Sequence, residues 1–171
     1  MSSKTRLILH DLRPGDAAAV LPAQSEECLL FAAYPAVRYC VGCYGCWTKT
    51  PGKCVIRDRG ADMAGMMPKC GEFIILSRLV FGGLSPDIKA VMDRSIGFVL
   101  PFFRIVKGEM HHVPRVEHPP DLRYVFYGAD MTEREKETAK ALAKANSINL
   151  ASGRSEIQFF PTFRDCKEVL K

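Results

Sequence analysis

The sequence predicts an α/β fold in which helices cover both faces of a parallel sheet. Short, continuous apolar runs, typical of strands buried on both faces, recur along the chain. Segments with helix start and stop signals separate these runs, and such alternation implies parallel neighbouring strands. The chain has 171 residues, 47% hydrophobic and 25% charged, which predicts one globular domain over residues 1–171.

The N-terminal part of the chain predicts two strands joined by a shortened crossover helix. The apolar run at residues 6–12 is the first expected strand, and residues 16–20 are the helix, which Pro22 ends. Residues 28–35 form a second apolar run without alternation, as a buried parallel strand does. The whole crossover spans only residues 12–27, so the first crossover helix is short.

The middle of the chain predicts a third strand between two helices. Residues 58–72 could hold a short helix whose methionines pack in the core. Residues 73–81 begin as a fully buried strand, which a pair of glycines then breaks. The next helix has Ser85 as its expected N-cap and Pro86 at its first position.

The C-terminal part predicts two more strands around the clearest helix of the chain. Residues 97–121 form a long connection rich in proline, histidine and aromatic residues, which is typical of a functional loop or an interface. Residues 122–128 and 156–161 are the expected strands. Between them, Thr132 and Glu135 occupy the positions of a capping box. A tail follows the last strand.

Charge and hydropathy exclude two classes of partner. Lysine and arginine number 24 against 19 acidic residues, a net charge of +5, without the basic, aromatic-interleaved stripe of a nucleic-acid surface. A basic pocket for an anionic small molecule fits this balance better. No apolar run approaches the ~18 residues of a membrane span, and no signal peptide is evident, so we expect a cytoplasmic protein without nucleic-acid or membrane contacts.

The stretch CVGCYGCWTKTPGKC brings together Cys40, Cys43, Cys46 and Cys54. The two-residue spacing of the first three lets thiolates converge on one metal centre, and Cys54 could add a fourth ligand after a turn. Zinc accepts four thiolates too, although its ribbons usually pair two separate knuckles. The alternative is that these are unligated thiols with a structural or redox role, since cytoplasmic cysteines stay reduced.

Three loops follow strands and should meet at the ligand-binding edge of the sheet, where the strands' carboxyl ends lie. They are HDLRPGD after the first strand, SRLVFGGLSPD after the third and YGADMT after the fourth. In the second loop, two glycines let the backbone approach a ligand and the next helix offers free N–H groups to an anion. An ordinary strand-to-helix turn is the alternative. His10, at the end of the first strand, could contact an anion or be a buried histidine.

Two segments within residues 39–149 carry a family resemblance. CVGCYGCWTKTPGKCVIRD and FIILSRLVFGGLSPDIKAVMDR, in this order, resemble the NADPH-dependent FMN reductase and iron–sulfur flavoprotein group of the flavodoxin-like superfamily. The resemblance implies a flavodoxin-like three-layer α/β/α sandwich with a five-stranded parallel sheet, FMN as cofactor, NAD(P)H as co-substrate and a homo-oligomer, dimer or tetramer, whose subunits complete the flavin pocket. It also makes a [4Fe–4S] cluster the first metal to consider on the four cysteines, although related reductases keep similar cysteines without one.

The resemblance also assigns cofactor-binding positions. Along the flavin ring it places the following residues: Ser77, Arg78, Leu79, Phe81, Gly82, Gly83, Tyr127 and Gly128. In the loop after the first strand, Asp11 and Arg13 are further candidates for cofactor binding. The family's Ser/Thr-rich phosphate loop is missing here, so Arg13, Arg78 or backbone amides near Gly15 would have to replace its hydroxyls. Otherwise the site is vacant or holds another anion.

We therefore expect an FMN-dependent NAD(P)H oxidoreductase that passes electrons to a small-molecule acceptor. No catalytic side chain is assigned, because the cofactor carries the chemistry. Lys89, Asp93 and Arg94 match the family's helix motif and are expected to be structural or interfacial. One alternative is an iron–sulfur flavoprotein electron carrier with a cluster on the four cysteines. Another is a non-catalytic module that has lost the phosphate loop.

Overall fold

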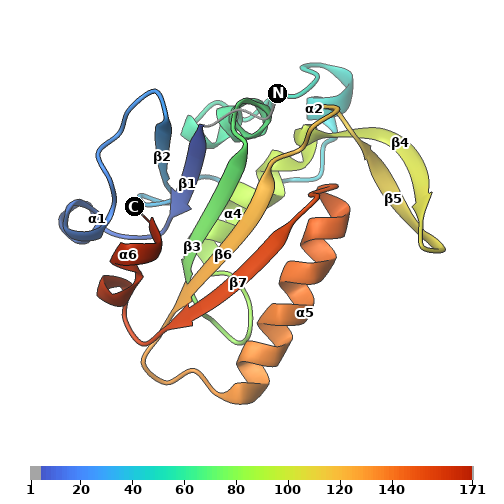
Figure 1. Cartoon of the computed structure of the whole chain (residues 1–171). Helices are drawn as coiled ribbons and strands as arrows, with labels where there is room; N and C mark the ends of the chain where they lie inside the picture. Colours follow the sequence, from blue (N-terminus) through green and yellow to red (C-terminus); the bar gives the residue numbers. More distant parts are fainter. Residues whose placement is uncertain (1–4, 171) are drawn as a thin grey trace.

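Residues 5–170, which the computed structural model describes, contain a five-stranded parallel sheet with strand order β2-β1-β3-β6-β7 (Figure 1). The strands are β1 (Arg6–His10), β2 (Cys28–Ala32), β3 (Glu72–Arg78), β6 (Asp121–Tyr127) and β7 (Ser155–Phe160). The predicted α/β fold with a five-stranded parallel sheet is confirmed. The chain first moves outward from β1 to β2 and then returns to β3, so the strand order reverses between β1 and β3.

Helices cover both faces of this sheet. One face carries α1 (Pro14–Val20) and α6 (Lys167–Leu170), and the other carries α3 (Met63–Met66), α4 (Pro86–Arg94) and α5 (Glu133–Asn149). Successive strand residues point to opposite faces, so Ile8 packs in the cluster that contains Leu170, while Leu7 and Leu9 pack in the cluster that contains Ile88. The three predicted layers and the short first crossover helix, seven residues long, are therefore present.

Several predicted local features hold, with one correction. The region predicted as one short helix consists of three consecutive short helical segments, η1 (Arg59–Asp62), α3 and η2 (Met67–Lys69). The methionines at positions 63 and 67 are fully buried. The capping box of α5 forms as expected. Ser85 does precede α4, but its side chain makes no capping bond, and its buried hydroxyl has no partner among the described residues.

The long connection expected at residues 97–121 is in fact largely a β-hairpin. After η3 (Ser95–Phe98), β4 (Val99–Val106) pairs antiparallel with β5 (Glu109–Pro114), and the hairpin projects from the body (Figure 1). Lys107 and Gly108, with φ of 51° and 85°, form the two-residue turn that favours such hairpins. Adjacent phenylalanines and a proline within β4 break the alternation of apolar and polar residues, so the sequence pattern did not reveal a strand.

Short helices also occur where none was predicted. The tail after β7 folds into η4 (Phe163–Cys166) and α6, and the cysteine segment contains α2 (Gly45–Thr48). Among the described residues, every helix is too short or too polar to cross a bilayer.

Candidate functional site

Asp11 joins the carboxyl ends of three strands. Its Oδ2 accepts a hydrogen bond from the backbone N–H of Arg78 (2.9 Å), and its Oδ1 accepts one from the Tyr127 hydroxyl (2.9 Å). Gly128 extends this edge by donating its N–H to the carbonyl of Phe160 (3.0 Å). Burial and the Asp11 carboxylate raise the pKa of Tyr127, so the phenol stays protonated and donates. The structure thus brings together predicted residues from three loops at the point where the strand order reverses.

The loop after β3 is fastened at its base by Ser77. This side chain is fully buried, accepts a hydrogen bond from the backbone N–H of Ser85 (2.9 Å) and donates one to the carbonyl of Arg78 (2.9 Å). Leu79 donates its N–H to the carbonyl of Tyr127 (2.9 Å) and packs against the core. Ser77 and Leu79, two of the predicted cofactor contacts, therefore hold the loop in place from within the protein.

The tip of this loop is a tight, braced turn. Val80 and Gly83 exchange two backbone hydrogen bonds (3.0 and 2.9 Å), which leaves Phe81 and Gly82 as the central residues at φ of 50° and 76°. A Cβ on Gly82 would lie 2.7 Å from the Cβ of Thr138 in α5, so glycine is required there. Phe81 is 92% exposed. A bulky residue at positive φ is strained, and such strain is common at ligand sites.

Two exposed arginines belong to the same edge. Arg13 places its guanidinium 4.6 Å from the centre of the Tyr34 ring, and Arg78 ends β3. A third arginine, Arg59, is occupied differently, because its guanidinium donates to the carbonyls of Ala32, Ala33 and Pro35. Arg59 closes the end of β2, while the side chains of Arg13 and Arg78 remain available to an anion. We refer below to Asp11, Arg13, Arg78, the Phe81–Gly82 turn and Tyr127 as the rim.

His10 lies just beneath the rim as a buried, neutral histidine. It is 4% exposed, and its Nδ1 has no hydrogen-bond partner within residues 5–170. Burial, reinforced by the Arg59 guanidinium and opposed by a backbone hydrogen bond with Leu12, lowers the pKa of His10 to about 4. A neutral imidazole does not attract an anion by charge, so the buried-histidine reading of the sequence is the correct one.

The four clustered cysteines line one cavity of about 520 Å³. Cys46 is buried, Cys54 is half-buried, and Cys40 and Cys43 are exposed. Burial raises the pKa of the Cys46 thiol, and the three neighbouring thiols raise it further, so the four sulfurs lie within electrostatic reach of one another. The apolar part of the cavity comes from residues that the sequence analysis did not single out as a site: Leu84, Met92, Ile96, Leu142 and Leu150.

The thiols surround this cavity without forming a preformed metal site. Within residues 5–170, no group of three cysteine, histidine or acidic side chains is arranged to hold a metal ion. All seven cysteines are free. The four predicted ligands thus line one cavity. Binding of an iron–sulfur cluster by them stays a prediction.

Arg94 anchors the cysteine segment to α4. Its side chain is fully buried and pairs with Asp58, and it also donates to the carbonyls of Ile56 (2.9 Å) and Arg38 (3.2 Å). Burial would lower the pKa of Arg94, but hydrogen bonds with Asp58 and Cys54 raise it overall. Its Nε lacks a partner among the described residues, and Arg94 lines the cysteine cavity. The structural role expected for Arg94 is therefore observed.

A row of stacked rings joins the cysteine segment to the hairpin. Tyr44 stacks on Trp47 (5.4 Å between centroids), Trp47 packs on His112 (4.9 Å), and His112 packs on Phe103 (4.8 Å). The Trp47 indole donates to a backbone carbonyl at the start of β4 (2.8 Å). His111 points the other way and contacts an asparagine of α5 (3.0 Å). The hairpin and the cysteine segment therefore form one continuous surface.

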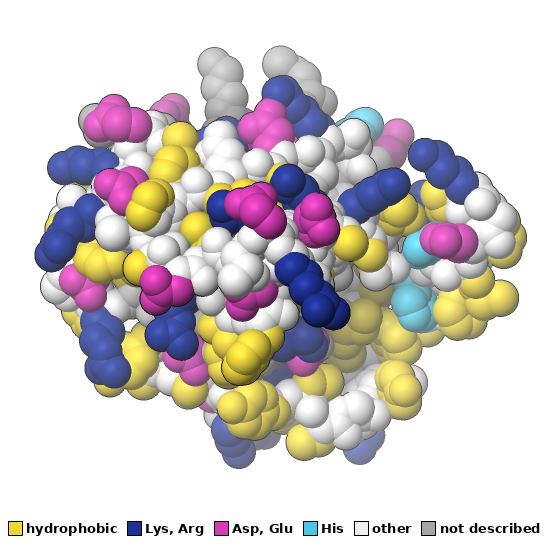
Figure 2. Space-filling model, turned by 90° about the horizontal axis from the view of Figure 1, so that it is seen from below, with side chains coloured by type: hydrophobic (Ala, Val, Ile, Leu, Met, Phe, Trp, Pro, Cys, Tyr) yellow, Lys and Arg dark blue, Asp and Glu magenta, His cyan; other side chains and the backbone are white. Residues whose placement is uncertain are grey.

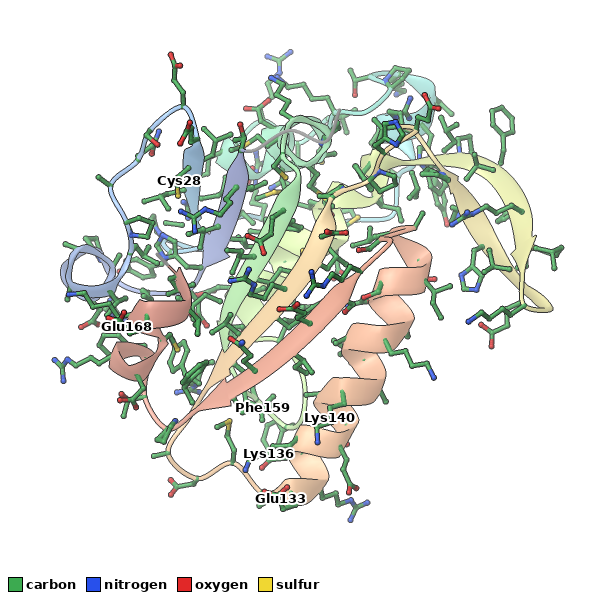
Figure 3. The ribbon with its side chains drawn as sticks, in the orientation of Figure 1. Cys28, Glu133, Lys136, Lys140, Phe159 and Glu168 are labelled. Carbon is green, nitrogen blue, oxygen red and sulfur yellow. The ribbon has the colours of Figure 1, made fainter. Side chains whose placement is uncertain are left out.

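The cysteine cavity runs along α4 and α5. Its lining begins at Leu84, in the loop after β3, and extends to Arg94 and Asn149 in the last turns of the two helices. The thiols belong to the Arg94 end, where Cys54 interacts with Arg94. Figure 3 shows the labelled Glu133, at the start of α5, at the same end of the molecule as the arrowheads of the strands. The nine residues of α4 span about 14 Å between the Leu84 end of the cavity and its Arg94 end.

Comparison with solved structures identifies the architecture. The chain superposes with a TM-score of 0.57 on an FMN-dependent NADH-azoreductase from Bacillus anthracis str. Ames Ancestor, solved in complex with FMN, at 13% identity, covering 99% of this chain and 92% of that one. With the azoreductase AzrA the TM-score is 0.59 at 8% identity, covering 97% and 91%. The chain has a flavodoxin-like fold. No family model matches this flavodoxin-like chain.

A curated relative points in the same direction. An iron–sulfur flavoprotein from Methanocaldococcus jannaschii is 40% identical over 65 residues, which are 36% of this chain and 33% of the relative. The match thus spans about a third of that protein. Together with the fold, it confirms the predicted resemblance to flavodoxin-like flavoproteins.

Proposed function

We propose that this flavodoxin-like protein is an FMN-dependent NAD(P)H oxidoreductase that passes electrons to a small-molecule acceptor. The observation that carries the proposal is the rim, which lies where the strand order reverses and ligands bind in open α/β sheets. There the braced turn presents Phe81 to solvent, and the exposed side chains of Arg13 and Arg78 supply positive charge. The structural similarity to an FMN-dependent NADH-azoreductase with bound FMN supports the same reading.

The donors at the rim fit a flat anionic cofactor. They are arginine side chains instead of the hydroxyl groups that the family uses. The loop HDLRPGD contains no serine or threonine, so the FMN phosphate would be held by the guanidinium of Arg13. Arg78 adds a second cation. The negative charge of Asp11 is already bound by two donors, the Tyr127 hydroxyl and a backbone N–H.

The chain's own contribution would be positioning. FMN, when bound, supplies hydride acceptance from a nicotinamide and onward electron transfer. Phe81 would cover one face of the ring and exclude water from it. Asp11 keeps the Tyr127 hydroxyl and the backbone of Arg78 in fixed orientations. Because the pKa of Tyr127 is raised, its phenol keeps its proton at neutral pH. The side chain therefore forms hydrogen bonds as a neutral hydroxyl group and does not act as a base.

A second candidate function, an iron–sulfur flavoprotein, is favoured by the cysteine cavity. Cys40, Cys43, Cys46 and Cys54 line one space, and thiolates are the ligands that iron–sulfur clusters use. The unpartnered Nε of Arg94 adds a buried donor at the same cavity. The match to an iron–sulfur flavoprotein supports this candidate. In a cluster-binding state, the loop carrying Cys40 and Cys43 would have to draw the thiols together.

Purification without oxygen followed by absorption spectroscopy and ligand titration tests both candidates. We expect FMN to raise the melting temperature of the full chain, because a ligand that binds only the folded state stabilises it. Arg13→Gln should weaken FMN binding by about tenfold to a hundredfold, the cost of a charge-assisted hydrogen bond, and leave riboflavin binding almost unchanged. Lys144→Gln, which removes an exposed cation from α5, is the matched control.

The alternatives predict different results. A broad visible absorbance that disappears in air and in a Cys43→Ser variant would favour the iron–sulfur flavoprotein. A colourless protein that neither FMN nor riboflavin stabilises would exclude the oxidoreductase and favour a non-catalytic module. Equal losses of FMN and riboflavin affinity in Arg13→Gln would mean that Arg13 does not hold the phosphate.

A further inference from the structure

The cysteine cavity is a mostly apolar space where several elements meet. Its walls come from the cysteine segment, from α4, from α5 and from the β4–β5 hairpin, which contributes Val99 and His112. Figure 2 shows hydrophobic side chains gathered beside histidines where this hairpin lobe meets the body. The volume of about 520 Å³ lies within the range of roughly 300–1,000 Å³ that is typical of small-molecule sites. The cavity is therefore large enough for an aromatic molecule of two fused rings with substituents.

Two residues of the cavity lining have a buried polar atom without a partner among the described residues. These atoms are Nε of Arg94, whose side chain is fully buried, and Nδ1 of His112. The guanidinium group of Arg94 is always protonated, so its Nε–H is a donor that lacks an acceptor. A buried donor without a hydrogen bond costs free energy, and an oxygen atom of a bound molecule would remove that cost. The ligand should therefore carry an acceptor oxygen.

The charges around the cavity are already paired. Lys89, Asp93 and Arg94 are the charged residues among the described lining. Lys89 pairs with Asp93, and Arg94 pairs with Asp58 behind the cavity wall. An anionic ligand would lose its hydration here without meeting a free cation, which is costly in an apolar space. A neutral molecule with a carbonyl oxygen fits this balance better.

The cavity is separate from the rim, because none of the rim residues lines it in the part of the chain that the structure describes. We propose that the cysteine cavity is a second ligand site, which binds a neutral, apolar small molecule through a carbonyl oxygen that accepts a hydrogen bond from the Nε–H of Arg94. This inference goes beyond the proposed oxidoreductase and does not depend on FMN. It competes with the iron–sulfur cluster of the second candidate function, since both would use the same donor and the same space.

Fluorescence titration of the full chain with prodan (6-propionyl-2-dimethylaminonaphthalene) tests the site. This neutral ketone emits at shorter wavelength in apolar surroundings, and we expect a Kd on the order of 10 μM. Ile96 lines the cavity and is 38% exposed, so Ile96→Trp should fold and should weaken binding by about tenfold or more by filling the space. Ile105→Trp is the matched control, because Ile105 lies on the exposed hairpin outside the lining, and it should leave the Kd unchanged.

A second probe tests the hydrogen bond. 2-Dimethylaminonaphthalene has the same rings as prodan but no carbonyl group, so the wild type should bind it about tenfold more weakly. Arg94→Lys keeps a cation beside Asp58 but lacks the Nε–H, so it should weaken prodan binding by about tenfold and leave the carbonyl-free probe unaffected. If Arg94→Lys does not fold, the comparison of the two probes on the wild type decides the question.

Several results would contradict the proposal. Equal affinities of the wild type for the two probes would overturn the role of the carbonyl oxygen. An unshifted prodan emission, or binding that survives in Ile96→Trp, would overturn the site itself, as would a bound cluster that excludes prodan or competition by saturating FMN. A protein that binds prodan but not FMN would contradict the proposed oxidoreductase and support the second site.

Discussion

At the scale of single residues, two buried titratable or charged side chains lie beneath the candidate sites. Arg94 lies beneath the cysteine segment, where it neutralises Asp58 and binds two backbone carbonyls. His10 lies beneath the rim, between the end of β1 and Arg59. Both are charged or titratable groups in an apolar interior, so their contributions to stability depend on partners that a sequence pattern does not show.

Replacing Arg94 should be costly. Arg94→Gln removes a fully buried cation and leaves Asp58 with only the exposed Arg38 as a charged partner, and breaking a buried pair typically costs about 3–5 kcal/mol. Arg38→Gln is the matched control, because Arg38 approaches the same carboxylate (3.7 Å) but its side chain is 67% exposed, so its loss should cost less than about 1 kcal/mol. Urea denaturation of the two variants measures the difference. Similar free energies of unfolding would show that burial of Arg94 does not matter.

The pKa of His10 makes stability depend on pH. The folded value is about 4, below the ordinary value of 6.5, so the unfolded chain binds the proton more readily between these values. Neutral His10 contributes its full share to the free energy of unfolding above pH 6.5. This contribution, at most roughly 3 kcal/mol, is lost as the pH falls towards 4. We expect His10→Asn to flatten the curve of unfolding free energy between pH 4 and 6.5. His118→Asn, at an exposed position, should leave the slope unchanged.

At the scale of elements, the same turn geometry appears twice with different surroundings. Phe81–Gly82 and Lys107–Gly108 both place two residues at positive φ between paired strand-like segments. The first turn packs against α5, and the second is the solvent-exposed tip of the hairpin. Only the first belongs to the rim, because it follows the carboxyl end of β3, and its glycine lies close to Thr138.

These twin turns provide a matched pair of substitutions. Gly108→Ala should cost only the backbone strain of a left-handed residue, about 1–2 kcal/mol, because nothing lies within 4 Å of the new Cβ. Gly82→Ala adds a 2.7 Å approach to Thr138, so its cost should exceed that of Gly108→Ala by about 1–3 kcal/mol. Thermal unfolding measures both. The extra cost should shrink in a Gly82→Ala/Thr138→Gly variant compared with Thr138→Gly alone, because only glycine at position 138 removes the Cβ that the new methyl group would meet. If the extra cost persists, the contact with Thr138 is not its cause.

At the scale of the whole molecule, side-chain contacts join the cysteine segment to the rest of the fold. Trp47, the chain's single tryptophan, donates to the backbone of β4 and packs against the main core cluster. Arg94 ties the segment to α4. These contacts extend the core into a region that the sequence presents as a glycine-rich loop, and they favour one domain over residues 1–171.

One unfolding transition is therefore expected. Trp47 fluorescence reports on the cysteine segment and far-UV circular dichroism reports on the sheet and helices, so their urea midpoints should coincide if the chain is one cooperative domain. In Arg94→Gln, the contacts that tie the cysteine segment to α4 are lost. The urea midpoint measured by Trp47 fluorescence should then be lower than the midpoint measured by circular dichroism. Separate midpoints in the wild type would instead mean that the cysteine segment unfolds independently.

By itself, the sequence determined the order of the five strands of the parallel sheet and of the helices between them, their layers, the capping of α5 and the resemblance to flavodoxin-like flavoproteins. These features depend on local periodicity, on end signals of helices and on motifs that are contiguous in the chain. It also selected the four cysteines and the loops that meet at the rim, because the carboxyl ends of parallel strands lie together in any such sheet.

Only the tertiary structure decided how those residues are used. It turned Ser77 inward, made Asp11 a brace between three strands and placed the cysteine cavity along α4 and α5. It also showed that the expected loop at residues 97–121 is a hairpin with an uncovered apolar face. The physical reason is that these outcomes depend on contacts between residues far apart in the chain, such as Asp11 with Tyr127 and Trp47 with His112.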